Sequence, residues 1–225
     1  MTNPYPILNV EEVVLRTPTT TVVTAEEAIK IIEQLETAME QFKGCVGLAA
    51  PQIGISKAVA IIRHEEREIN LINPTILETT TPFVHRREGC MSFPGKRFDV
   101  PRFRLIRYET DALWSYENNK PEPVFAPDYL PGQPTRLVRR ETVSCADEDE
   151  EDPAVSLIAI AVQHEIDHLL GLCLPWKEGA VEVEGDPIIR PVLVARVGRN
   201  DPCPCGATDP VTGRRKKFKK CCGKI

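Results

Sequence analysis

The first strong hydrophobic pattern along the chain lies between Thr24 and Gly44. Thr24 and Glu27 form a capping-box pattern that marks the start of a helix, and Gly44 marks its end. The apolar residues between them recur every three or four positions: Ala28, Ile31, Ile32, Leu35, Ala38, Met39 and Phe42. This spacing predicts an amphipathic helix with one face toward a core.

A second helix is predicted from about Pro153 to Leu170. Asp152 suits the N-cap position, Pro153 suits the first turn, and Gly171 suits the C-terminal stop. Apolar residues lie nearly all round this helix: Leu157, Ile158, Ala161, Val162 and Leu169. We therefore expect it to be buried.

Strands are predicted at residues 57–62, 68–72, 104–109 and 136–144. Five prolines between positions 121 and 134 predict an extended surface loop, because proline disfavours both helices and central strands. The acidic run at 147–152 predicts a solvated loop before the second helix.

Composition places these elements in one ordinary domain with an appendage. The chain has 225 residues, and a hydrophobic fraction of 42% excludes global disorder. No apolar run approaches the roughly 18 residues of a membrane span, and the N-terminal residues do not resemble a secretion signal. We therefore expect a cytoplasmic protein without a membrane partner. Eight cysteines in such a compartment favour metal ligands or catalytic thiols over disulfides.

Charge is distributed unevenly along the chain. Residues 196–225 hold 9 Lys and Arg against 2 Asp and Glu, a net charge of +7. The remaining residues hold 19 against 31, a net charge of −12. We therefore expect an anionic partner to bind the tail rather than the body.

The strongest chemical pattern is the segment from His164 to His168, which reads His-Glu-Ile-Asp-His inside the second helix. Histidines four residues apart project from one helix face, so both can bind one divalent metal. Glu165 lies beside His164 and can act as a general base toward a water at that metal. A lone buried histidine is usually a core residue, but this pair around a glutamate favours a metal site.

A catalytic metal needs a third protein ligand, and the residues alone leave three candidates. The spacing of metzincin proteases requires a histidine at the position of Leu174. A downstream acid, Glu178 or Glu182, would correspond to thermolysin-like proteases. Cys90, in the segment 87–94, offers a thiolate, which binds metals strongly.

A third segment, from Val46 to Gln52, is small and apolar and ends in an amide that can donate to an oxyanion. Together the three segments resemble the peptide deformylase family, whose motifs are Gly-x-Gly-x-Ala-Ala-x-Gln, Glu-Gly-Cys-x-Ser and Gln-His-Glu-x-Asp-His. They stand here at residues 45–52, 88–92 and 163–168. Cys45 replaces the first glycine, and Met91 replaces a usual leucine.

The resemblance covers about residues 1–195. It implies an α+β fold with mostly antiparallel sheets packed around a central catalytic helix. It also implies a hydrolase that removes the N-formyl group from the N-terminal formylmethionine of newly synthesised peptides and releases formate.

The resemblance further implies a role for each matching residue. Cys90, His164 and His168 would bind the metal, which is Fe²⁺ in the family, with Zn²⁺ or Ni²⁺ able to occupy the site. Glu165 would transfer the proton, and Gln52 with the backbone N–H of Met91 would stabilise the oxyanion. The residues expected to bind the substrate are Gly47, Gly89, Leu157, Ile158 and Ala161.

The tail carries four cysteines: Cys203, Cys205, Cys221 and Cys222. They resemble a SEC-C zinc motif, with a longer separation between the two pairs, and imply one structural Zn²⁺. The basic tail is also a candidate for binding the ribosome. The expected organisation is a catalytic domain at 1–195 followed by a zinc-binding motif at 196–225.

Two other functions stay open at this point. A zinc endopeptidase of the His-Glu-x-x-His type shares the helix motif but needs a third ligand other than Cys90. A non-catalytic module that binds a ribosome or a chaperone needs neither Glu165 nor Gln52.

Overall fold

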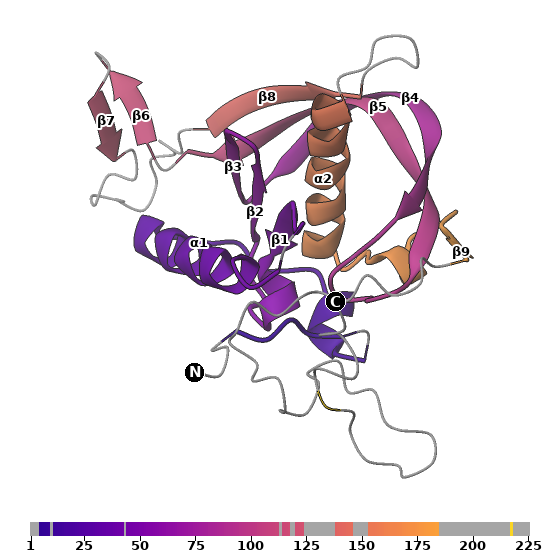
Figure 1. Cartoon of the computed structure of the whole chain (residues 1–225). Coiled ribbons are helices and arrows are strands. Elements are labelled where there is room, and N and C mark those ends of the chain that lie inside the picture. The colour runs from indigo at the N-terminus through magenta and orange to yellow at the C-terminus, as the bar shows by residue number, and fades with distance from the viewer. Residues whose placement is uncertain are drawn as a thin grey trace.

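The computed structural model describes residues 5–9, 11–42, 44–112, 114–117, 120–123, 138–145, 153–184 and 217. Figure 1 shows helix α2 (Pro153–Leu169) enclosed by β-sheets, with helix α1 (Ala25–Met39) on the outer side of the smaller sheet. All strand pairs of the named sheets are antiparallel. The predicted α+β fold with a central helix is therefore confirmed.

Both predicted helices are present. The bounds of α2 are nearly those expected, whereas α1 ends five residues before the predicted stop at Gly44. Thr24 caps α1, because its side chain accepts a hydrogen bond from the backbone N–H of Glu27 at 3.2 Å. This helix ends at Met39, and Phe42 follows in a turn, so the hydrophobic pattern outlasts the helix. Gly171 ends α2 with φ = 73°, the left-handed conformation that favours glycine at a helix C-terminus.

The smaller sheet contains β1 (Gly47–Ala49), β2 (Val59–His64) and β3 (Arg67–Ile72), in that order. Its side chains alternate between two hydrophobic clusters. Val59 and Ile61 pack in the cluster of α1, whereas Ala60 and Ile62 pack in the cluster of α2. The sheet is thus buried on both faces, and its strands β2 and β3 lie where the sequence predicted strands, at 57–62 and 68–72.

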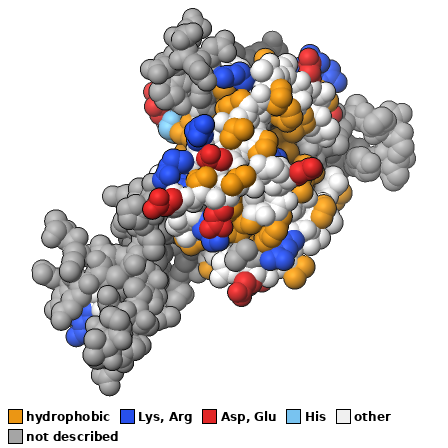
Figure 2. Space-filling model, turned by 90° about the vertical axis from the view of Figure 1, so that its right-hand side faces the viewer, with side chains coloured by type: hydrophobic (Ala, Val, Ile, Leu, Met, Phe, Trp, Pro, Cys, Tyr) orange, Lys and Arg blue, Asp and Glu red, His pale blue; other side chains and the backbone are white. Residues whose placement is uncertain are grey.

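The larger sheet has the order β4–β5–β8, and β9 pairs with β5. Its strands are β4 (Thr75–Glu88), β5 (Arg97–Asp111), β8 (Val138–Ser144) and β9 (Val181–Val183). The sequence pattern predicted part of β5 and all of β8 but missed β4, because β4 exposes side chains on both faces. Figure 2 shows that hydrophobic side chains lie among charged ones on this face of the molecule. Val84 and Phe103 are among the exposed hydrophobic residues of these strands.

The expected surface loop at 121–134 needs one correction. Strands β6 (Trp114–Glu117) and β7 (Lys120–Pro123) form a two-stranded antiparallel sheet, which includes Pro121 and Pro123. Proline is compatible with such a strand because a two-stranded sheet has an open edge on each strand. Residues 124–134, the acidic run at 147–152 and the four tail cysteines lie outside the described residues.

The described part of the chain also contains three short 3-10 helices: η1 (Val13–Arg16), η2 (Ala50–Ile53) and η3 (Leu174–Trp176). They lie near the C-terminal end of α2 and the start of the smaller sheet (Figure 1). No helix in the described part of the chain is long and apolar enough to cross a membrane.

Candidate active site

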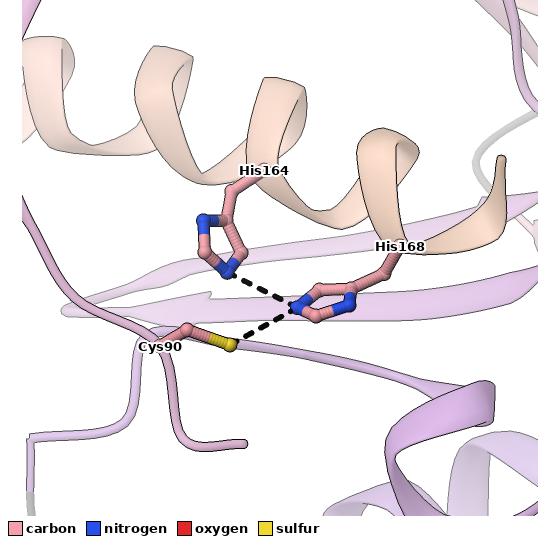
Figure 3. Close-up of side chains that lie close together, drawn as sticks. All are labelled: Cys90, His164 and His168. Carbon is pink, nitrogen blue, oxygen red and sulfur yellow. Dashed lines mark hydrogen bonds between the residues drawn. The ribbon is translucent and has the colours of Figure 1, made fainter. Parts of the chain in front are cut away.

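Three side chains from two distant parts of the sequence converge at one point. His164 and His168 project from the same face of α2, and Cys90 lies in the loop that follows β4 (Figure 3). The Nε2 atom of His168 lies 3.2 Å from the Cys90 Sγ atom and 3.2 Å from the His164 Nε2 atom. One donor atom of each residue lies within 4.8 Å of the other two.

This donor set fits a metal ion. Three ligands on a tetrahedral metal with bonds of about 2.0–2.3 Å stand about 3.3–3.6 Å apart, close to the observed spacings. The His168 Nε2 atom faces both other donor atoms, but it can donate at most one hydrogen bond. A hydrogen bond from this atom therefore accounts for only one of the two contacts, whereas a shared metal ion accounts for both. Of the three candidates for the third ligand, Cys90 is the one in this cluster. Leu174 is buried in the core, and Glu182 pairs with Lys96 at the surface.

The second ring nitrogen of each histidine is held by another residue. His164 Nδ1 lies 2.6 Å from Glu88 Oε1, and His168 Nδ1 lies 3.0 Å from Cys173 Sγ. Each imidazole is therefore oriented with Nε2 toward the cluster. Such outer partners fix the tautomer of metal-binding histidines.

Behind the histidines lies a buried ion network that the sequence analysis did not find. Arg102, whose side chain is 1% exposed, donates through Nε to Glu88 Oε2 at 2.9 Å and through Nη2 to Glu88 Oε1. Its Nη1 donates to Asp167 Oδ2 at 2.5 Å, and Lys177 pairs with Asp167 Oδ1 at 2.9 Å. Burial by itself raises the pKa of Glu88. Hydrogen bonds from His164, His85 and Arg102 outweigh burial and hold this pKa well below its usual value.

Glu165 lies beside the cluster and is 3% exposed. Its Oε2 atom is buried and has no hydrogen-bond partner among the described residues. Burial raises the pKa of Glu165 to about 7. Gly47 of β1 packs directly against this side chain, since a Cβ atom at position 47 would overlap Glu165 Oε1.

Gln52 presents its amide N–H group to the same site. Its Oε1 atom accepts a hydrogen bond from the backbone N–H of Ala49 at 2.9 Å, which fixes the direction of the amide. Its Nε2 atom then lies 3.3 Å from Ser92 Oγ and 3.6 Å from Cys90 Sγ. Met91 follows Cys90 directly and is half-buried.

The residues expected to bind the substrate differ in their burial and in the side chains that they contact. Ile158 and Ala161 belong to the hydrophobic cluster between α2 and the smaller sheet, whereas Leu157 is 38% exposed. Gly89 lies against Arg97, because a Cβ atom at position 89 would meet the Arg97 guanidinium.

Comparison with known proteins identifies the family. The family model described as polypeptide deformylase matches residues 4–119, which include the motifs at 45–52 and 88–92. A peptide deformylase of Prochlorococcus marinus (strain NATL2A) is 30% identical over 180 residues, covering 77% of this chain and 73% of that protein. A peptide deformylase of Carboxydothermus hydrogenoformans is 33% identical over 157 residues, covering 70% of this chain and 81% of that protein.

Solved structures of peptide deformylases are also similar to this chain. A peptide deformylase of Synechococcus elongatus, in complex with actinonin, has a TM-score of 0.56 and 28% identity, covering 76% of this chain and 77% of that one. The peptide deformylase of Thermotoga maritima has a TM-score of 0.56 and 27% identity, covering 76% of this chain and 95% of that one. The chain therefore belongs to the polypeptide deformylase family and is a hydrolase that removes the N-formyl group from newly synthesised peptides.

Proposed function

We propose that Cys90, His164 and His168 hold one divalent metal ion and that deformylation takes place at this site. The observation that carries the proposal is the convergence of one sulfur and two Nε2 atoms, with each ring held from behind. Thiolate and imidazole suit Fe²⁺, Zn²⁺ and Ni²⁺, and the family resemblance favours Fe²⁺. Bound there, such a metal supplies Lewis-acid polarisation and makes water nucleophilic at neutral pH.

Glu165 carries the proton in this mechanism. Its unpartnered Oε2 atom accepts a proton from the water that attacks the formyl carbon. The same oxygen then donates this proton to the departing amide nitrogen, so that formate and a free amino terminus leave. Because Glu165 is enclosed by the protein, no bulk water competes for that proton.

Gln52 and Met91 stabilise the negative charge that develops on the formyl oxygen. The Gln52 Nε2 group is held by the Ala49–Oε1 bond with its N–H bonds toward Cys90, so it needs no reorganisation during the reaction. The backbone N–H of Met91 supplies the second donor, because this residue directly follows the ligand Cys90.

The formylated methionine binds beside the metal. Gly47 and Gly89 border the peptide through their backbone atoms, since the space beside their Cα atoms is filled by Glu165 and Arg97, respectively. Leu157, Ile158 and Ala161 contribute to the pocket of the methionine side chain. Partly exposed Leu157 is suited to the entrance, whereas Ile158 and Ala161 lie deeper in the hydrophobic cluster.

We further propose that the C-terminal tail localises the enzyme near its substrates. Cys203, Cys205, Cys221 and Cys222 bind one structural Zn²⁺ in a separate motif at 196–225, after a catalytic domain at 1–195. The net charge of +7 in this tail favours binding to ribosomal RNA phosphates, near the emerging formylated peptides. The site of action is accordingly the bacterial-type cytoplasm. Deleting 198–225 should weaken co-sedimentation with ribosomes and leave turnover of a short formyl peptide unchanged.

The metal site is tested by replacing its thiolate ligand. Cys90→Ala should lose the catalytic metal and formate release together. The matched Cys145→Ala should keep both, because Cys145 directly follows β8 and does not belong to the cluster of donor atoms. Metal content and formate are measured on the same preparations. A Cys90→Ala protein that retains as much metal as the wild type, together with full activity, would contradict the assignment.

A further inference from the structure

Cys173 lies directly behind one of the proposed metal ligands. It follows α2 by four residues and is 2% exposed. Its Sγ atom lies 3.0 Å from His168 Nδ1 and 3.1 Å from the carbonyl oxygen of Leu15. In Figure 3 the second ring nitrogen of His168 points away from Cys90. This nitrogen is the Nδ1 atom that the Cys173 Sγ atom contacts.

The hydrogen atoms of this contact can be assigned by elimination. A metal-binding imidazole is neutral and uses the Nε2 lone pair, so its proton is on Nδ1. The Leu15 carbonyl can only accept, and a buried thiol has one proton to donate. His168 Nδ1–H therefore donates to the Cys173 sulfur, and the Cys173 S–H donates to the Leu15 carbonyl.

We propose that Cys173 is a positioning residue for His168, a thiol relay that joins a metal ligand to the η1 segment of the backbone. The proposal rests on the metal site described above. Under this proposal the two histidines differ in the group that contacts their Nδ1 atoms. His164 is backed by the carboxylate of Glu88, and His168 is backed by a neutral, weakly accepting sulfur.

The other end of the relay is firmly anchored. Leu15 is fully buried in a cluster with Phe93 and Cys173. Its neighbour Arg16 lies over the ring of Trp176, at 4.1 Å from the centroid. Gly171 packs against the same segment, because a Cβ atom at position 171 would stand 2.9 Å from the Arg16 carbonyl. A sulfur held between a rigid backbone and the ring restricts the rotation of the imidazole.

A plain packing role makes a different prediction. As a small apolar core residue, Cys173 would be replaced by alanine at a modest cost in stability, without a specific effect on the metal. If Cys173 is a relay, the serine variant should keep metal binding better than the alanine variant. A hydroxyl can accept a hydrogen bond from His168 and donate one to the Leu15 carbonyl. Packing and positioning are therefore separated by two variants of similar size.

The experiment uses the full-length protein with Co²⁺ as the probe, and Co²⁺ binding to the proposed tail site, which all variants share, is measured with Cys90→Ala and subtracted. Wild type, Cys173→Ala, Cys173→Ser and the control Cys145→Ala are stripped of metal and titrated with Co²⁺ against a chelator. The visible absorption of the Co²⁺ forms reports the ligand geometry, and thermal unfolding of the metal-free forms reports packing. If the alanine variant does not fold, Cys173→Val replaces it, because valine fills the space without a hydrogen bond.

We expect Cys173→Ala to bind Co²⁺ about tenfold or more weakly, with a changed spectrum. Cys173→Ser should stay within about threefold of wild type in Co²⁺ affinity, because it keeps the hydrogen bonds whose loss costs tenfold or more. Equal affinity and identical spectra for wild type and the alanine variant would overturn the inference, as would equal losses in the serine and alanine variants. A wild-type protein that binds no more Co²⁺ than Cys90→Ala would instead contradict the metal site itself.

Discussion

Replacing Arg102 by leucine removes the cation that joins Glu88 to Asp167 inside the protein. Arg102 makes three hydrogen bonds to these carboxylates and is 1% exposed. Removing one partner of a buried ion pair costs about 3–5 kcal/mol, because an uncompensated charge stays behind. Here Glu88 keeps its contacts with histidines, and Asp167 keeps Lys177.

We therefore expect the low end of that range, about 3 kcal/mol of unfolding free energy. For a domain of this size, a loss of 1 kcal/mol lowers the melting temperature by about 2–4 °C, so the expected decrease is about 6–12 °C. The assay is urea and thermal unfolding of the metal-free protein at neutral pH, followed by circular dichroism.

Arg107→Leu is the matched control. Arg107 pairs with Glu78 at 2.8 Å, but the two side chains are 52% and 51% exposed. Exposed pairs of this kind contribute at most about 1 kcal/mol. If Arg102→Leu costs no more than Arg107→Leu, the buried network does not stabilise the fold in the way described.

Three further predictions concern the site and its supporting turn. Glu165→Gln should lower kcat for formate release by about 10²–10⁴-fold while metal content stays unchanged; substantial residual turnover would exclude Glu165 as the proton carrier. Gly47→Ala should lower kcat by about tenfold or more, because the new Cβ atom displaces the Glu165 carboxylate, which a crystal structure of the variant would reveal; unchanged kcat would contradict the close packing. Gly171→Ala should cost about 1–3 kcal/mol in urea unfolding, because φ = 73° and the Arg16 carbonyl both oppose a side chain; a variant as stable as wild type would refute this.

The helices were predictable because their signals are local. The Thr24 cap, the three-to-four residue spacing and Gly171 all act within a few positions, and both helices match them. Strand β4 was not predictable from pattern, because exposure on both faces leaves no alternation to detect. Its position is determined by pairing with β5, a contact between residues distant in sequence.

The candidate site likewise has features that the sequence predicted and features that only the folded chain reveals. The spacing of His164 and His168 follows from helix geometry and could be read directly. The choice of Cys90 over Glu178 and Glu182 needed the family resemblance, because a loop and a helix far apart in sequence have to meet. The contacts of Arg102 and Cys173 had no sequence signal, since a buried polar residue acquires its partners only in the folded chain.

Formate release tests the central claim most directly. The full-length protein, reconstituted with Fe²⁺ under nitrogen, is incubated with an N-formylmethionyl peptide, its N-acetyl counterpart, and an unblocked peptide of the same length. We predict one formate and one free amino terminus per formylated peptide, with far slower reaction of the acetylated peptide and intact internal bonds in all three. Cleavage of internal peptide bonds, or a metal-loaded protein that releases no formate, would contradict the account.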